Sequence, residues 1–283
     1  MKKSGKIFLA FFCLSLSFIS YSYASGDDIA IYGDSQDNPE IQRSLVQTIM
    51  SFKPSVVFRV GDLVNNGNDP ESWRAFNEIH GPLITTTEYF PALGNYERDP
   101  SLYFAQFPSI NNQRWYSVDR LGIHFVILDS NSVLDIGSEQ YRWLESDLAQ
   151  AGDAVKFKVV IFHHPLFDVG RLRVSDEKKI RSILLPLFEM YGVSAVFSGH
   201  SHNYQRFEYS GIYFIVTGGG GSLMNEQKQG THDDSYLDKF IVAYHFCLLT
   251  PEGRFLRVKV IDIDSNTIDE FEIPSAAPKY SAY

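Results

Sequence analysis

Five short runs of carboxylate, amide and imidazole side chains in this sequence each follow an apolar segment. Oxygen and imidazole donors of these kinds are the ligands that suit Mn, Fe or Zn ions. Any one run could instead be a turn or a helix cap, which is the usual role of a lone Gly-Asp pair. Five of them at strand ends predict a metal site. The runs are Asp34-Ser35-Gln36, Gly61-Asp62, Gly94-Asn95, His163-His164-Pro165 and Gly199-His200-Ser201-His202.

The last of these runs places two imidazoles two residues apart. The apolar stretch Ser194–Phe197 before it indicates a buried strand, which fixes the backbone just ahead of the histidines. Gly199 removes a side chain where the chain must turn. His200 and His202 can therefore face two neighbouring metal positions.

The segments before the runs indicate an α/β fold. A strand at Ile29–Tyr32, a helix at Pro39–Phe52 and a strand at Ser55–Val60 open the chain as a β-α-β unit. In open α/β sheets ligands bind at the carboxyl ends of the strands, where Asp34 and Asp62 lie. Further apolar runs or strands are expected at Tyr89–Leu93, Trp115–Val118, Ile123–Leu128 and Phe157–Phe162, and further helices at Glu71–Ile79, Ser138–Gln150 and Ser175–Tyr191, the last broken near Pro186.

The pattern changes in the C-terminal part of the chain. Short turns separate the expected strands there, which indicates hairpins added to a sheet and not another βαβ unit. These strands are Ile212–Thr217, Phe240–Leu249, Phe255–Ile263 and Thr267–Ile273. We expect the glycine run Gly218–Gly221 to form a flexible turn near the mouth of the site, with a phosphate-cradling loop as the alternative. Cys247 lies in an apolar run and is expected to be a buried thiol.

Composition and charge limit the classes of partner. The chain has 283 residues, is 44% hydrophobic and carries a formal net charge of -9, so it can bury a sizeable core. With this charge and no basic stripe, duplex nucleic acid is not an expected partner.

The N-terminus predicts export. Three lysines precede the apolar stretch Ile7–Ile19, and Ser22-Tyr23-Ala24 forms a small-x-small cleavage site. Residues 1–24 are therefore expected to be a signal peptide, with an uncleaved membrane anchor as the alternative. We expect residues 25–275 to form a single domain, residues 276–283 to form a loose tail, and no membrane span to remain after cleavage.

The ordered set of motifs resembles the calcineurin-like metallophosphoesterase superfamily, and its secreted, purple-acid-phosphatase-like branch in particular. The resemblance implies an α/β fold built as a four-layered α/β/β/α sandwich of two mixed sheets. The segments that carry it are Gly61-Asp62-Leu63-Val64, Pro91-Ala92-Leu93-Gly94-Asn95, Ser138-Glu139-Gln140-Tyr141-Arg142-Trp143-Leu144, His163-His164-Pro165 and Gly199-His200-Ser201-His202-Asn203-Tyr204.

The resemblance also implies two metal ions, of Mn, Fe or Zn, and a ligand set. Asp62 would bridge the ions. The first ion would be completed by Asp34 and His202, with Gln36 as a further candidate, and the second by Asn95, His163 and His200. His163 is preferred to His164 because the family's His-x-Pro pattern places the ligand two residues before the proline, which leaves His164 beside the site.

Three positions depart from the family pattern. Gln36 stands where the family often has a histidine, which would weaken or alter the first metal site. Asn65 replaces the tyrosine that binds ferric iron in purple acid phosphatases, so a purple Fe(III)–tyrosinate centre is not expected. Tyr96 replaces the histidine that follows the ligand asparagine, and its hydroxyl is a donor but a poor base near pH 7. We expect Tyr96 to hydrogen-bond the phosphate, with reduced or altered activity.

The chain is thus expected to be an exported phosphoesterase that hydrolyses small phosphomonoesters or phosphodiesters by attack of a hydroxide bridging the two ions. The alternative is a metal-retaining binding or surface protein whose catalysis weakened when Tyr96 replaced the histidine. Tyr204 and Arg206 could buttress the histidine loop or be ordinary strand residues. The sequence leaves the substrate, the metal identity and the oligomeric state open.

Overall fold

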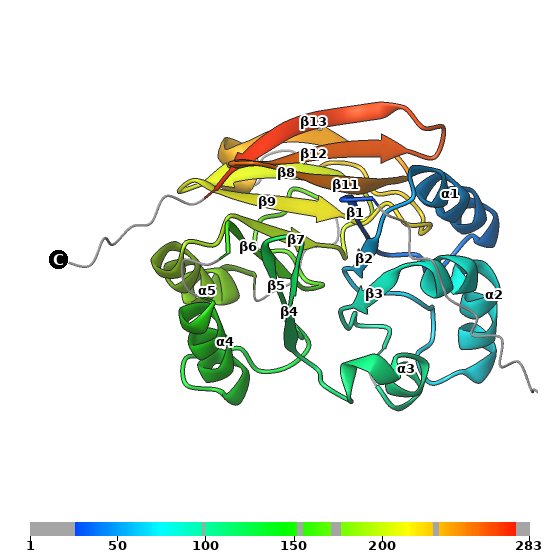
Figure 1. Ribbon diagram of the computed structural model, residues 1–283, viewed down its shortest axis with the longest axis horizontal. Coiled ribbons are helices and arrows are strands. Elements are labelled where there is room, and N and C mark those ends of the chain that lie inside the picture. Colours follow the sequence, from blue (N-terminus) through cyan, green and yellow to red (C-terminus); the bar gives the residue numbers. More distant parts are fainter. Residues whose placement is uncertain (1–25, 98–99, 152–154, 171–176, 229–231, 276–283) are drawn as a thin grey trace, which may run out of the picture.

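Two β-sheets pack face to face, and helices cover their outer faces (Figure 1). The computed structural model describes residues 26–97, 100–151, 155–170, 177–228 and 232–275. This architecture confirms the predicted four-layered α/β/β/α sandwich. The expected signal peptide (1–24) and loose tail (276–283) lie outside the described residues. None of the helices in the described part of the chain has the length and hydropathy needed to cross a membrane.

The first sheet combines a parallel half with a C-terminal hairpin half. It consists of β1 (Ile29–Tyr32), β2 (Val56–Arg59), β3 (Glu88–Pro91), β11 (His245–Glu252), β12 (Phe255–Asp262) and β13 (Thr267–Pro274). Their order is β13-β12-β11-β1-β2-β3. β1 to β3 run parallel, whereas β11 pairs antiparallel with β1 and continues into the β12 and β13 hairpins. The carboxyl ends of the three parallel strands therefore meet at one edge.

The second sheet is also mixed. It consists of β4 (Tyr116–Arg120), β5 (Ile123–Ile127), β6 (Phe157–Ile161), β7 (Ala195–Ser198), β8 (Tyr204–Tyr209), β9 (Ile212–Thr217) and β10 (Leu237–Ile241). Their order is β10-β8-β9-β7-β6-β5-β4. β5, β6, β7 and β9 run parallel, so the ends of β6 and β7 reach a common edge as well.

Helices on either side complete the four layers. They are α1 (Pro39–Phe52), α2 (Pro70–Thr86), α3 (Ser101–Gln106), α4 (Glu139–Gln150) and α5 (Glu177–Tyr191), with short 3-10 turns at Pro108–Ile110 and His232–Tyr236. α1 and α2 lie against the first sheet, and α4 and α5 against the second (Figure 1). The Ser138 side chain caps α4 by accepting from the Tyr141 N–H at 3.2 Å, as the sequence predicted.

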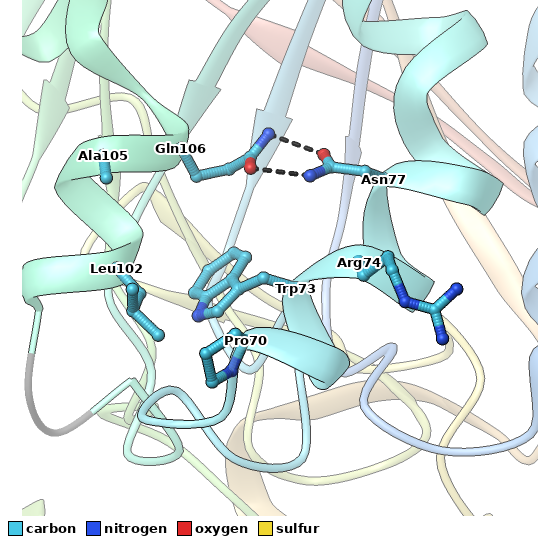
Figure 2. A pocket seen from close by; sticks show the side chains of 7 residues that line it. All are labelled: Pro70, Trp73, Arg74, Asn77, Leu102, Ala105 and Gln106. Carbon is cyan, nitrogen blue, oxygen red and sulfur yellow. Dashed lines mark hydrogen bonds between the residues drawn. The ribbon is translucent and has the colours of Figure 1, made fainter.

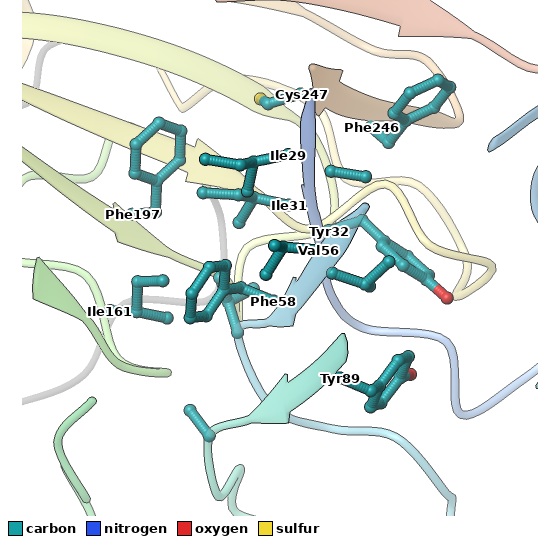
Figure 3. Close-up of a cluster of buried hydrophobic side chains, with 14 of the residues drawn as sticks. Ile29, Ile31, Tyr32, Val56, Phe58, Tyr89, Ile161, Phe197, Phe246 and Cys247 are labelled. Carbon is teal, nitrogen blue, oxygen red and sulfur yellow. The ribbon is translucent and has the colours of Figure 1, made fainter. Parts of the chain in front are cut away.

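The space between the sheets is filled by aromatic and β-branched side chains (Figure 3). Phe58 of β2 stacks on Phe125 of β5 with ring centroids 4.1 Å apart. Ile31, Ile161 and Phe197 belong to the same buried cluster. Because this layer is packed solid, the strand ends of both sheets are held in fixed relative positions. Cys247 is buried there, as predicted.

Four expectations about the elements were wrong. α2 runs on to Thr86, past the expected end at Ile79. α5 continues through Pro186, because Leu184 and Leu187 on either side of it are buried against the second sheet and tertiary packing outweighs the proline penalty.

The expected strand Phe240–Leu249 is two strands in different sheets, β10 and β11, and Val242 between them is exposed. The run is apolar apart from Tyr244 and His245, so its composition hides the crossing between layers. The glycine run is not a flexible turn at the site mouth either. Gly218–Gly221 is buried, and a Cβ at Gly218 would lie 2.2 Å from the Ser201 carbonyl oxygen.

Candidate metal centre

The structure brings all seven predicted ligand residues to one place. Asp34 and Gln36 follow β1, Asp62 follows β2 and Asn95 follows β3, whereas His163 follows β6 and the His200–His202 pair follows β7. The two sheets meet here directly. The backbone N–H of His200 donates to Asp34 Oδ1 at 2.8 Å, and His163 Nε2 lies 3.2 Å from Asp62 Oδ2.

Four donor atoms converge around His163. Its Nε2 lies 3.0 Å from Asn95 Oδ1, 3.2 Å from Asp62 Oδ2 and 3.3 Å from His200 Nδ1. His200 Nδ1 is also 3.1 Å from Asn95 Oδ1. Ligands bound at about 2.1 Å to one ion in tetrahedral or octahedral geometry lie about 3.0–3.4 Å apart. The spacing of these four atoms therefore fits a shared metal ion.

The tautomer of His163 supports this arrangement. Its Nδ1 lies 3.0 Å from the Val60 carbonyl oxygen, which can only accept, so Nδ1 carries the proton. When a metal ion takes the place of the Nε2 proton, Nε2 presents its lone pair on the side where the oxygens of Asn95 and Asp62 lie. A backbone carbonyl that fixes the ring in this way is the usual outer contact of a metal-binding histidine.

A second group adjoins Asp62, since ligand atoms of Asp34, Asp62 and His163 lie within 4.8 Å of one another. His202 Nε2 is 3.7 Å from Asp34 Oδ1 and 3.4 Å from the Gln36 side-chain nitrogen. His202 Nδ1 faces the Leu223 carbonyl oxygen at 2.9 Å, so Nε2 again points its lone pair at the group. Within the described part of the chain, buried Asp34 Oδ2 and Gln36 Oε1 have no hydrogen-bond partner. Two orphaned oxygens beside an imidazole lone pair fit a cation.

Three of the candidate ligands have an unusual backbone. Asp34, Asp62 and His200 have φ values of 58°, 49° and 67°, in the left-handed region. Residues other than glycine adopt it at a cost that the surroundings must offset, and such residues cluster at functional sites. The neighbouring glycines allow the loops to approach closely, since a Cβ at Gly199 would lie 2.2 Å from Asp34 Oδ2.

Two buried charged side chains that we did not predict hold these loops. Glu97 accepts hydrogen bonds from the backbone N–H groups of Asp62 at 3.1 Å and Gly94 at 2.8 Å, and from two further amides after Asp62. Arg59 is fully buried and donates to Tyr89 Oη at 2.7 Å and to the Ser35 hydroxyl. The sequence signal for Arg59 is a charged residue inside an apolar strand, and Glu97 follows directly on the asparagine motif.

The histidine loop is held by a buried polar network. Ser201 Oγ donates to Asp168 Oδ2 at 2.7 Å, and Gln205 Nε2 donates to Asp168 Oδ1 at 2.6 Å. Tyr204 and Arg206, in contrast, both donate to Asp269 of β13, at 2.8 and 2.9 Å. Through Asp269 they join the two sheets, so they are strand residues with a cross-sheet role.

The two residues expected beside the metals, His164 and Tyr96, differ in how their side chains are held. The ring of His164 is 4.9 Å from that of His163, and its Nδ1 lies 2.8 Å from Ser130 Oγ. Burial and the neighbouring His163 lower the pKa of His164 to about 2, so its ring is neutral. Tyr96 donates its backbone N–H to Asp62 Oδ1 at 3.0 Å, and its side chain is 43% exposed.

Comparison with known proteins agrees with this geometry. A family model described as Calcineurin-like phosphoesterase matches residues 28–204, which is more than half of the chain. The chain belongs to the calcineurin-like phosphoesterase family.

Several relatives of this calcineurin-like phosphoesterase are named purple acid phosphatases. Purple acid phosphatase 22 of Arabidopsis thaliana is 29% identical over 198 residues, 64% of this chain and 45% of the relative. The chain spans about half the length of the curated relatives it matches.

Two solved structures share the fold. Purple acid phosphatase PPD1 from yellow lupin (Lupinus luteus) seeds has a TM-score of 0.76 at 19% identity, covering 90% of this chain and 57% of that one. GAP50, the anchor in the inner membrane complex of Plasmodium, has a TM-score of 0.73 at 18% identity, covering 89% of this chain and 90% of that one.

In this calcineurin-like phosphoesterase, two of the departures from the family pattern line one cavity. A cavity of about 400 Å³ between the starts of α1 and α2 is lined by Gln36 and Asn65 among others. Asn65 Oδ1 turns to accept from Ser72 Oγ at 2.9 Å. The metal centre therefore borders open volume on the side of Gln36.

A second hollow, of about 350 Å³, lies between α2 and α3 (Figure 2). Trp73 lines it, and the side-chain amides of Asn77 and Gln106 pair across it at 2.8 and 2.6 Å. No histidine, cysteine or carboxylate is among its seven lining residues, so it offers no metal chemistry. The lining residues are Pro70, Trp73, Arg74, Asn77, Leu102, Ala105 and Gln106.

Protons and metal ions compete for the donor atoms of the centre. Burial raises the pKa of Asp34 to about 6, against the opposing effect of His163 and His202. Burial lowers the pKa of His200 to about 4. Burial opposes protonation of His163 too, but the carboxylates of Asp62 and Asp34 overcome it and raise its pKa to about 9. Without a metal ion, the proton on His163 supplies a positive charge beside the carboxylates of Asp34 and Asp62. A bound metal ion can supply that charge in place of the proton.

Proposed function

We propose that this member of the family is a dinuclear-metal phosphoesterase acting on small phosphomonoesters or phosphodiesters. One observation carries the proposal. Lone pairs from the ends of five strands in two sheets face one another at ligand-to-ligand spacing, with two buried oxygens left unpartnered. The donors are oxygen and nitrogen only, which suits Mn, Fe or Zn.

The proposed ligand set follows the two groups. Asp62 lies between them, with Oδ2 beside His163, and can contribute to both ions. The first ion is assigned to Asp34, Gln36 and His202, and the second to Asn95, His163 and His200. Two such ions lower the pKa of water and orient phosphoryl oxygens for in-line displacement.

The charges of the candidate ligands determine whether the metal-loaded site attracts a phosphoester anion. Only Asp34 and Asp62 among the seven candidates are acids. Two divalent ions bring four positive charges and the acids cancel two, so the site keeps a net attraction for a phosphate anion. Asn95 contributes a neutral oxygen and so preserves this net positive charge, whereas an aspartate at the same position would cancel a third one of the four positive charges. Tyr96 and His164 are the two side chains proposed to face the substrate without binding metal.

We also propose that the protein is exported after removal of residues 1–24, on the strength of the N-terminal sequence pattern. The mass of the protein recovered from the producing cell tests this, because cleavage after Ala24 removes a defined mass. Full-length mass in the recovered protein would contradict it.

The enzymatic proposal is tested by metal analysis together with hydrolysis of mono- and bis-p-nitrophenyl phosphate. We expect two ions per chain and turnover of at least one ester. Asp62→Ala should lose both, whereas Asp264→Ala, in an exposed turn, should keep both. Two bound ions without turnover of any phosphoester would instead favour the alternative of a metal-retaining binding protein.

A further inference from the structure

His164 lies beside the metal centre, and one of its ring nitrogens is within 4.8 Å of donor atoms of His163 and His200. Its ring lies 4.9 Å from that of His163 and 4.8 Å from that of His200, and it is partly exposed. Its Nδ1 and its backbone N–H both meet Ser130 Oγ, at 2.8 and 3.1 Å. One edge of the ring is therefore fixed, and the other edge is free to meet a ligand.

The contacts of Ser130 bear on which ring nitrogen of His164 carries the proton. The backbone N–H of His164 can only donate, so it occupies one of the two lone pairs of Ser130 Oγ. If Oγ also accepted from Nδ1–H, its own proton would have no acceptor among the described residues, whereas a hydroxyl that donates to Nδ1 uses that proton. A neutral imidazole whose Nδ1 accepts carries its proton on Nε2. In this tautomer the edge of His164 away from Ser130 is an N–H donor, and Nε2 offers no lone pair to a metal ion.

The loop that carries Ser130 is itself immobilised. Asn131 Nδ2 donates to the Gly94 carbonyl oxygen at 3.1 Å, which ties this loop to the one carrying Asn95. Asp129 accepts from Arg114 at 2.7 Å, and Gln140 bonds both the N–H and the carbonyl of Asp129. A donor held this firmly loses little further freedom when an anion arrives, so its hydrogen bond retains more of its strength.

We propose that His164, held by Ser130 with its proton on Nε2, donates a hydrogen bond to a phosphoryl oxygen of the substrate bound at the metal centre. The assignment rests on the proposed function. Ser130 acts through His164 and is a positioning residue. Tyr96 contacts the same centre through its backbone N–H, and its side chain is exposed.

Inorganic phosphate is the probe for this contact, with binding to the metal-loaded protein measured by titration calorimetry. From the free energy that a hydrogen bond to a charged group contributes to binding, we expect His164→Leu to weaken phosphate binding about 10- to 100-fold. His164→Gln, whose amide can place an N–H near the position of Nε2, should recover most of that loss. Both variants should still bind two metal ions. Loss of an ion in either one would make His164 a ligand and overturn the proposal.

The proton position is measured without metal or activity, from two-bond ¹H–¹⁵N correlations of the histidine rings in the metal-free protein. His164→Gln identifies the signals of this ring. We expect the Nε2–H form in the wild type and a shift toward the Nδ1–H form in Ser130→Ala. Ser132→Ala, which removes a hydroxyl bonded to Asp129 in the same loop, is the matched control and should leave the His164 signals unchanged.

The outcomes separate this proposal from the proposed function. An Nδ1–H form in the wild type, or unchanged phosphate affinity in His164→Leu, would refute the role of His164 even if two metals and turnover were found. A wild type that binds no metal would overturn the proposed function, and the phosphate contact with it.

Discussion

Replacing Gly94 with alanine should separate two loops of the metal centre. The new Cβ would lie 2.1 Å from Asp62 N and 2.2 Å from Asp62 Oδ1. Contacts below 3.0 Å are not tolerated, so the loops must move apart by the difference of 0.9 Å. The obstacle is backbone, and Glu97 holds the same N–H at 3.1 Å, so no flexible side chain can give way.

The magnitude follows from this displacement. Overpacking of a rigid interior costs about 1–3 kcal/mol. For a chain of this size each kcal/mol lowers the melting temperature by about 2–4 °C, so we expect a loss of roughly 2–12 °C. Metal ligands must stay within about 0.2 Å of their proper distances. Movement of Asp62 by several times that amount should also weaken metal binding.

The assay compares melting temperatures of the metal-free proteins and then titrates each with Mn²⁺ or Zn²⁺. Gly81→Ala is the control, because a Cβ at Gly81 in α2 meets nothing within 4 Å. Its helix gain of about 0.5–1 kcal/mol is opposed by the restriction on a residue before proline, so its melting temperature should barely change. Wild-type melting and wild-type metal affinity in Gly94→Ala would refute the close approach of the two loops.

Three further outcomes are expected. Burial alone would lower the pKa of His124, but hydrogen bonds to Asp147 and Asp119 raise it above its usual value; the stabilisation is then full below about pH 6.5 and lost as pH rises through the folded-state pKa. His124→Gln should therefore lower the melting temperature more at pH 6 than at pH 9, and an equal loss at both would contradict the assignment. Chelation of ions present at 100 times their Kd should remove about 2.7 kcal/mol per site, which is about 5.4 kcal/mol for two ions or roughly 11–22 °C by calorimetry, and an unchanged melting temperature would argue against metal binding. Gln36→His should tighten the first metal site in competition with a chelator, since imidazole is the stronger ligand; weaker binding would show that the Gln36 amide is specifically required.

The sequence predicted which strand ends carry the candidate ligands, because each motif sits where a buried strand must stop. The alternation of β-branched runs and turn residues located the ends of β1, β2, β6 and β7. Parallel strands bring such ends to one edge, so Asp62 and His163 could be expected to meet. The left-handed backbone of Asp34, Asp62 and His200 could not be predicted from the sequence pattern. Residues other than glycine disfavour this conformation, and only the packing of the loops against one another enforces it.

Other features depended on contacts between distant segments. The break between β10 and β11 lies in a run that is apolar apart from Tyr244 and His245, so composition gave little sign of it. The passage of α5 through Pro186 is decided by the packing of α5 on the second sheet. Ser130 carries no motif, and its role is visible only once its loop lies beside His164.

The pairing of β1 with β11 has a consequence for the order of assembly during synthesis. Ile29 lies opposite Leu249, 220 residues later, so the strand that carries Asp34 keeps an open edge until almost the whole fold has been made. All seven candidate ligands have been synthesised by His202, well before that edge closes. Contacts across such separations form slowly. The metal centre is therefore expected to mature late, after the chain has left the ribosome, and pulse-labelled protein should acquire chelator-resistant metal only after a measurable delay.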